Sequence, residues 1–169
     1  MEIFRVGGQQ IHLGRSWRDS AGTQHPATWG RWSADEKAAA GISTVVLQPL
    51  PDDRLYTASH NPDGSVAATA RELDDVGEGM AKVPGVKSSL IALVKQQQGS
   101  LLSQTDWQII RKADAGAGTA IDAAVQTWRN AIRAKADASE AAITGAADTA
   151  ALATLLDAGS LFDWPEIDD

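Results

Sequence analysis

Histidines, paired aspartates and glycine-rich turns are the residues of this chain whose types and spacing could do chemistry. Three histidines are present, His12, His25 and His60, and imidazole is a common metal ligand. Zinc ligands usually follow one another at short, fixed spacings, and these three are widely separated in the sequence. The chain has no cysteine, so thiol catalysis, thiolate ligands and disulfides are excluded. We therefore predict structural or surface histidines and no metal site.

Two carboxylate doublets, Asp52-Asp53 and Asp74-Asp75, could in principle serve acid–base catalysis or cation binding. Adjacent residues point in different directions, however, so a doublet alone gives poor catalytic geometry. Asp52-Asp53 also follows Pro51 and precedes a predicted strand, a position typical of turn-forming acids. We interpret it as part of a turn.

Two glycine-containing stretches, Gly7-Gly8 and residues 116–119, could be compared with phosphate-binding loops. Neither has the GxxxxGK[ST] order, and no lysine is placed to reach a phosphate. The nucleophile elbow Gly-x-Ser-x-Gly is also absent from the sequence. The sequence therefore predicts no catalytic residue and no cofactor, and favours a protein that is not an enzyme.

Aromatic residues are the stronger functional signal, because the chain has six tryptophans but only two phenylalanines and one tyrosine. Exposed tryptophans often anchor protein interfaces. Three tryptophans fall in a loop-rich segment whose small hairpins could not easily bury them all, although they could also form the core of that unit. Trp164 lies near the C-terminus, where it could dock on its own domain or on a neighbour. The candidate partner-binding residues are Trp17, Trp29, Trp32, Phe162, Trp164 and Pro165.

The chain has a net charge of −7 and no basic stripe that could displace counterions from phosphates, so direct binding of nucleic acid is not expected. No run of about 18 apolar residues could span a membrane. The N-terminus lacks the apolar stretch of a signal peptide, and the lack of cysteine fits synthesis in a reducing cytoplasm.

Residues 1–71 are predicted to form a small β-rich unit. Gly7-Gly8 separates two short apolar runs and suits a hairpin turn that needs positive φ. Ser33 and Glu36 form a capping box for a short helix that Gly41 ends, and a strand follows over 42–48. A second hairpin is expected over 54–70, with its turn at 61–64, and residues 16–31 are expected to be loop. Residues 72–86 are rich in Gly, Pro and acids and are assigned as a linker.

Residues 87–158 are predicted to form a helical unit, followed by an extended acidic tail over 159–169. We expect a helix to end at Gly99, a second to begin after a capping box at Thr105, and glycines 116 and 118 to end it. Thr119 could cap a third helix, and an Ala-rich stretch over 137–158 could form the last. Trp107 and Trp128 are expected in the helical core. The fold class is thus α+β, with an N-terminal β-hairpin unit containing one short helix and a small C-terminal helical unit.

Several segments, in this order, resemble small tail proteins of tailed bacteriophages, in particular tail-fibre and tail-fibre-assembly-like proteins. The segments are 25–29, 33–42, 51–56, 61–65, 101–112, 128–133 and the pair Trp164-Pro165. The chain departs from that pattern in having Trp128 where a tyrosine is expected, and in its Ala-rich stretch over 134–158.

This resemblance implies a structural or adaptor protein of the virion tail, made in the host cytoplasm. It would attach tail fibres or baseplate components through contacts with other tail proteins, in repeated copies within a symmetric assembly. The alternative role is a chaperone that helps a tail fibre to assemble. A tail-associated cell-wall hydrolase is a third possibility, but it would need a catalytic constellation that the sequence does not provide.

Overall fold

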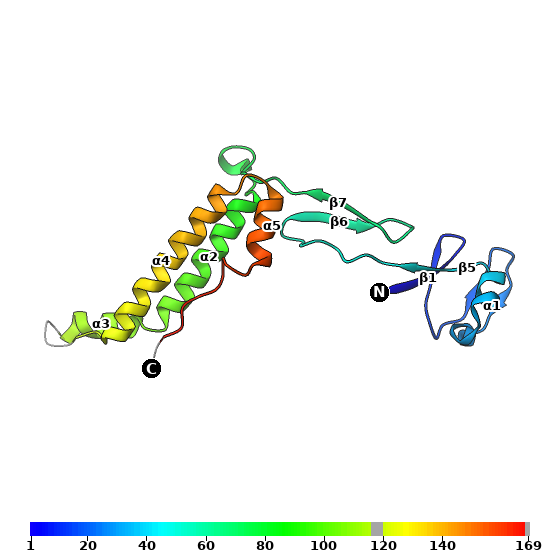
Figure 1. Ribbon diagram of the computed structural model, residues 1–169, viewed down its shortest axis with the longest axis horizontal. Coiled ribbons are helices and arrows are strands. Elements are labelled where there is room, and N and C mark those ends of the chain that lie inside the picture. The colour runs from blue at the N-terminus through cyan, green and yellow to red at the C-terminus, as the bar shows by residue number, and fades with distance from the viewer. Residues whose placement is uncertain (116–119, 168–169) are drawn as a thin grey trace. The chain divides into compact units, whose positions relative to one another are not determined.

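The computed structural model describes residues 1–115 and 120–167. It has short strands in its N-terminal part and helices in its C-terminal part (Figure 1), with 18% of the described residues in strands and 45% in helices, 3-10 helices included. This confirms the α+β class. The chain divides into two compact units, Met1–Thr69 and Ala70–Asp169, and each is described on its own.

A three-stranded antiparallel sheet organises the N-terminal unit. Its order is β2 (Gln9–Ile11), β1 (Glu2–Val6) and β5 (Ile42–Val46). Gly7 and Gly8 join β1 to β2 with φ angles of 55° and 85°. Positive φ at both positions is what a two-residue hairpin requires, so the predicted hairpin is confirmed.

Helix α1 (Ala34–Ala39) has the capping box that the sequence predicts. The Ser33 hydroxyl accepts a hydrogen bond from the Glu36 N–H at 3.2 Å, and the Ser33 N–H donates to the Glu36 carboxylate at 2.7 Å. The latter bond favours the charged carboxylate and lowers the pKa of Glu36. Gly41 then leaves the helix with a φ of 71° and leads into β5.

The segment expected to be loop contains short regular elements, β3 (Trp17–Arg18), β4 (Gln24–His25) and the 3-10 helix η1 (Ala27–Arg31). The two strands pair antiparallel, with Trp17 opposite His25. Sequence periodicity could not reveal them because two-residue strands are shorter than any recognisable repeat. Their tryptophans complete the core of the unit, whose buried members are Ile11, Trp17, Trp29 and Ile42.

A second hairpin, β6 (Tyr56–His60) and β7 (Val66–Ala70), forms where the sequence predicts it. Gly64 ends its turn with a φ of 86°, and a Cβ atom there would collide with the carbonyl oxygen of Val46. Both the backbone angle and the close approach therefore require glycine.

The segment assigned as a linker is an ordered loop of the C-terminal unit. Val76 and Val83 form an antiparallel bridge around the 3-10 helix η2 (Gly79–Ala81). The Gly85 N–H donates to the Asp75 carboxylate at 2.8 Å, immediately before α2 begins. Asp75 thus closes this loop on itself.

Helices α2 (Val86–Ser103) and α4 (Ala123–Gly145) pack side by side in the C-terminal unit (Figure 1). Helix α2 continues through Gly99, where the sequence predicts its end. Gly99 is exposed and a side chain there would meet open space, so the helix tolerates glycine at a modest cost in propensity. The buried side chains of the two helices are mainly aliphatic, namely Val86, Leu90, Val94, Val125, Ile132, Ala136 and Ile143.

Two shorter helices, α3 (Asp106–Ala115) and α5 (Thr149–Asp157), complete the unit. Asp122 caps α4 by accepting the Ala124 N–H at 2.8 Å, and Asp148 caps α5 by accepting the Ala151 N–H. The predicted helix end at glycines 116 and 118 and the predicted cap at Thr119 lie outside the described residues.

The C-terminal segment packs on its own helices. The Trp128 indole N–H of α4 donates to the Pro165 carbonyl at 2.8 Å, and the Trp164 indole N–H donates to the Gln97 side chain of α2 at 2.7 Å. Ser139 of α4 donates to the Leu161 carbonyl at 2.9 Å. These bonds hold the tail against both long helices.

Candidate protein-binding site

Helix α3 presents large apolar side chains to solvent. Trp107 is 56% exposed and Ile110 is 60% exposed, whereas Trp128 is 7% exposed. The expectation of a buried Trp107 is therefore wrong, while that for Trp128 agrees with the structure. The reason is that the polar start of α3 contacts the neighbouring helix α4, which turns the apolar side of α3 outward.

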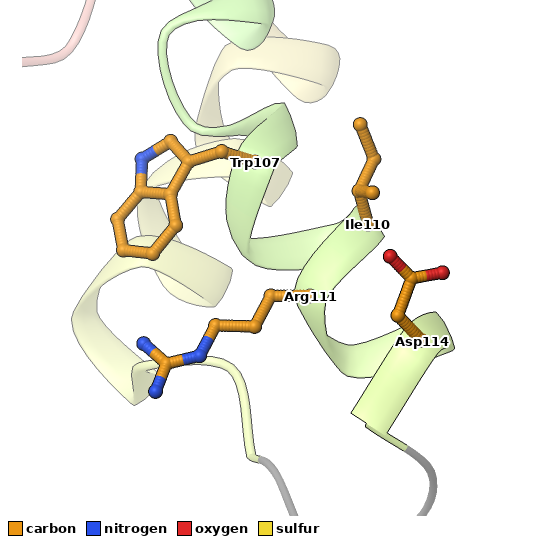
Figure 2. A pocket seen from close by; sticks show the side chains of 4 residues that line it. All are labelled: Trp107, Ile110, Arg111 and Asp114. Atoms are coloured by element: carbon orange, nitrogen blue, oxygen red, sulfur yellow. The ribbon is translucent and has the colours of Figure 1, made fainter.

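The exposed residues of α3 form two short rows (Figure 2). Trp107 and Arg111 lie on one side of the helix, and Ile110 and Asp114 lie on the other, so each row pairs residues one turn apart. A groove of about 510 Å³ is lined by these four side chains. We call these four residues the α3 surface.

A second, smaller groove of about 330 Å³ lies where α3 approaches the start of α4. Trp107 and Arg111 line it as well, together with Gln108 and Ile121. The Trp107–Arg111 row thus forms a ridge between two hollows. A partner side chain could enter on either side of the indole ring.

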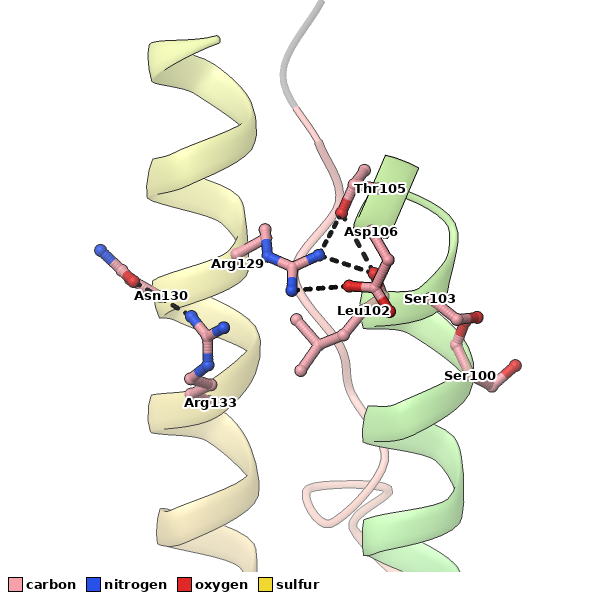
Figure 3. A network of polar contacts seen from close by, with 8 residues as sticks. All are labelled: Ser100, Leu102, Ser103, Thr105, Asp106, Arg129, Asn130 and Arg133. Carbon is pink, nitrogen blue, oxygen red and sulfur yellow. Dashed lines mark hydrogen bonds and ion pairs between the residues drawn. The ribbon is translucent and has the colours of Figure 1, made fainter. Parts of the chain in front are cut away.

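Arg129 of α4 fixes the junction between α2 and α3 (Figure 3). Its guanidinium donates to the Leu102 carbonyl at 2.7 Å, to the Thr105 hydroxyl at 2.7 Å and to the Asp106 carboxylate at 2.8 Å. Arg129 is only 6% exposed, so these bonds are shielded from water on the arginine side. One buried cation therefore sets the direction in which α3 leaves α2.

A second contact joins α3 to the start of α4. The Asp122 N–H donates to the Gln108 side-chain oxygen at 3.3 Å, and the Asp122 carboxylate caps α4. With Arg129 on one side and Gln108 on the other, α3 is fastened at two points. The α3 surface is thus preorganised, which lowers the entropic cost of binding a partner.

The candidate partner-binding tryptophans of the N-terminal unit lie together, but in the core of the unit. Trp29 has no exposed surface and Trp17 is 9% exposed, and Trp32 packs partly buried against them. The Trp29 indole N–H donates to the Arg15 carbonyl at 2.9 Å, and Trp17 stacks on His25 with ring centroids 4.0 Å apart. The hypothesis that these tryptophans are exposed anchors is wrong for Trp17 and Trp29, because the small sheet needs their bulk.

Phe162, Trp164 and Pro165 are partly buried on the helical unit. The bonds of Trp164 to Gln97 and of Trp128 to the Pro165 carbonyl engage the polar groups of this segment within the chain. Of the two possibilities left open by the sequence, docking on its own domain is the one seen. These residues therefore close the helical unit.

The aspartates and histidines considered for catalysis or metal binding form local structural contacts. The Asp52 carboxylate accepts the Arg54 N–H at 2.9 Å, which agrees with the turn interpretation. His25 lies 3.1 Å from Asp19, and His60 lies 2.7 Å from the Gln48 carbonyl. Within residues 1–115 and 120–167, no group of three or more His, Asp or Glu side chains could hold a metal ion.

Another exposed apolar group lies in the loop before α2, where Met80 is fully exposed and Val76 and Val83 are more than half exposed. These side chains project from the loop that Asp75 closes and are separate from the α3 surface. No helix in the described part of the chain is both long and apolar enough to cross a membrane.

Sequence reasoning missed the α3 surface although a signal was present. Residues 106–115 form an amphipathic pattern that places Trp107, Ile109 and Ile110 among charged residues.

Comparison with protein-family models, curated proteins and solved structures gives no match for this chain. The geometry of the α3 surface and the sequence segments that resemble phage tail proteins are therefore the basis for a proposed function.

Proposed function

We propose that this protein is an adaptor of a bacteriophage tail that binds other tail proteins through the α3 surface. The observation that carries the proposal is an exposed tryptophan on a helix whose direction is fixed by a buried arginine. Trp107 is 56% exposed, while Arg129, which holds the start of the helix, is 6% exposed. An exposed indole between two grooves, on a helix whose start is held in place, is typical of an interface anchor.

The energetics support this use of α3. An indole that enters a partner's pocket removes a large apolar area from water, and its N–H gives the contact direction. Arg111 and Asp114 border the groove, so the apolar centre has a polar edge, as interfaces usually do. Because α3 is already held by Arg129 and Gln108, little ordering is required on binding.

The assignment to a phage tail comes from the order of the resembling segments, one of which, 101–112, contains most of α3. In this role the chain would be present in the virion in repeated copies and would attach a tail fibre or baseplate component. Its N-terminal unit, with a separate core, would provide a second body for a second contact.

Quantitative mass spectrometry of purified particles tests this role. We expect the chain to be present in a fixed ratio to the tail-tube protein, in a multiple that fits the threefold or sixfold symmetry of a tail. In parallel, the full-length protein is immobilised and tail-fibre and baseplate proteins from the same genome are passed over it. Binding of one of these proteins by the wild type, and its loss with Trp107→Ala, is the expected result.

Other outcomes contradict the proposal in distinct ways. Binding to a nascent tail fibre with absence from mature particles would indicate an assembly chaperone. Release of soluble fragments from purified peptidoglycan would indicate a hydrolase. Equal binding of tail proteins by the wild type and Trp107→Ala would show that the α3 surface is not the contact site.

A further inference from the structure

The α3 surface is chemically self-complementary. It carries one cation, Arg111, one anion, Asp114, one indole N–H donor, Trp107, and one purely apolar side chain, Ile110. Neither Arg111 nor Asp114 forms an ion pair with another described residue. Helix α3 is also locally neutral, with two acidic and two basic residues, although the chain as a whole has a net charge of −7.

The spacing of these residues fits an antiparallel pair of α3 helices. If a twofold axis passes midway between positions 110 and 111, Trp107 of one copy faces Asp114 of the other, and Ile110 faces Arg111. The same axis matches both rows of Figure 2 at once, because the two rows are equally long and run in opposite directions in the second copy.

We propose that the α3 surface binds a second copy of this chain through an antiparallel, twofold-symmetric pair of α3 helices. In this pair each indole N–H donates to the Asp114 carboxylate of the other copy. Each Ile110 packs on the aliphatic stem of Arg111 of the other copy. The guanidinium of that Arg111 lies one helical turn from Asp114 of the chain whose Ile110 it contacts. Trp107 and Asp114 thereby gain polar partners, which polar groups require when an interface excludes water.

The dimensions of the groove agree with this occupant. Its volume of about 510 Å³ is open to solvent and leaves room beside Trp107 for a side chain of the second copy. The local neutrality of α3 is needed here, since two chains of −7 repel each other elsewhere on their surfaces. The surface carries both a donor, the Trp107 indole N–H, and an acceptor, the Asp114 carboxylate, so a second copy satisfies both groups at once.

A single ten-residue helix buries less area than a stable protein interface, so the pair is weak in isolation. We expect a dissociation constant of about micromolar or weaker for the free protein. Within an assembly that holds neighbouring copies together, the effective concentration rises and the same contact becomes populated. The inference rests on the proposed function in that it concerns the same surface, for which a second copy competes with another tail protein.

Directed cross-linking tests the orientation, because the natural chain has no cysteine and an introduced cysteine is unique. Full-length Trp107→Cys and Asp114→Cys proteins are mixed and treated with a short bismaleimide. In the antiparallel pair, position 107 of one copy lies opposite position 114 of the other. The mixed pair also retains one native contact between Trp107 and Asp114, so it still forms.

The expected result is a cross-linked heterodimer in at least fivefold excess over either homodimer, with a rate that rises with protein concentration. Ala134→Cys, at an exposed position of α4, is the matched control and should give little dimer. Equal amounts of the three dimers, or a Trp107→Cys homodimer in excess, would overturn the antiparallel arrangement.

Sedimentation equilibrium of the full-length wild type supplies an independent measurement. We expect the average mass to rise toward the dimer with concentration, and Trp107→Ala or Asp114→Arg to weaken the association at least tenfold. A wild type that stays monomeric to millimolar concentration would overturn the inference. If Trp107→Ala nevertheless abolished binding of another tail protein, the proposed function would stand and only the second copy as partner would be rejected.

Discussion

The tryptophan cluster of the N-terminal unit and the lone tryptophan of α3 show two opposite uses of one residue type. Trp29 has no exposed surface and its indole N–H is bound to the Arg15 carbonyl. Trp107 is 56% exposed and lies beside a groove. The first contributes to the stability of its own unit, and the second is placed for contact with another molecule.

The difference follows from the size of the two cores. The N-terminal sheet has three short strands, and a core of that size needs large side chains to bury enough apolar area. The helical unit has long aliphatic stripes on α2 and α4, which bury Leu90, Val94 and Ile132. It does not need Trp107 for its core, so this residue is available for binding.

The largest expected effect is on folding of the N-terminal unit. Trp29→Ala empties a fully buried site and should lower the free energy of unfolding of this unit by about 3–5 kcal/mol. Denaturant unfolding followed by near-ultraviolet circular dichroism measures the change. Val46→Ala in the same sheet is the control, because Val46 is 63% exposed and should change stability little. A Trp29 variant as stable as the wild type would contradict the assignment of this cluster to the core.

Local signals predicted the small elements of the N-terminal unit well. The Gly7-Gly8 turn, the Ser33–Glu36 capping box and the turn before Gly64 each depend on a few neighbouring residues, and each is present in the structure. Such features could be derived from sequence because their backbone geometry restricts the residue type at one or two positions.

The burial of the tryptophans could not be derived in this way. Whether Trp29 or Trp107 is exposed depends on contacts with distant residues, namely the Arg15 carbonyl in one case and the position of Arg129 in the other. Arg129 falls in a predicted helix, but its three hydrogen bonds reach residues more than 20 positions away. The predicted end of α2 is also wrong, since one exposed glycine does not stop a helix that tertiary packing supports.

The second effect tests whether the α3 surface depends on its buried support. Arg129→Met keeps the apolar volume but removes the donors to Leu102, Thr105 and Asp106, and should cost about 2 kcal/mol of stability. The variant should also weaken binding through α3, because α3 is then no longer held in its orientation. Arg133→Met is the matched control, since Arg133 is exposed and its side chain donates to nearby Asn130. Equal binding by both variants would show that α3 does not need Arg129.

A smaller effect concerns the loop that begins the helical unit. The Lys82 ammonium, the Ser88 hydroxyl and the Gly85 N–H hold the pKa of Asp75 well below its ordinary value. A depressed pKa in the folded state means that the carboxylate stabilises the fold above its unfolded pKa of about 4, and that this stabilisation is lost as the pH falls toward the folded pKa.

Asp75→Asn should therefore reduce stability most at neutral pH, and the difference from the wild type should shrink below about pH 4. Thermal unfolding measured from about pH 7 to about pH 3 detects this convergence. Asp74→Asn is the control, because the Asp74 side chain is 80% exposed and its ion-pair distance to Lys87 is 3.7 Å. A pH-independent difference between Asp75→Asn and the wild type would show that this carboxylate does not close the loop.

The smallest expected change in stability belongs to Trp107→Ala. Its side chain is largely in water in the folded chain, so its removal should alter the free energy of unfolding by no more than about 0.5 kcal/mol. The same substitution at Trp29 should cost several times more, although both remove an indole. Binding through α3 should change in the opposite order, with a loss of at least tenfold for Trp107→Ala. If Trp107→Ala instead destabilised the helical unit as strongly as Trp29→Ala destabilises the sheet, Trp107 would be a core residue, and the contrast between a tryptophan for folding and a tryptophan for contact would not hold.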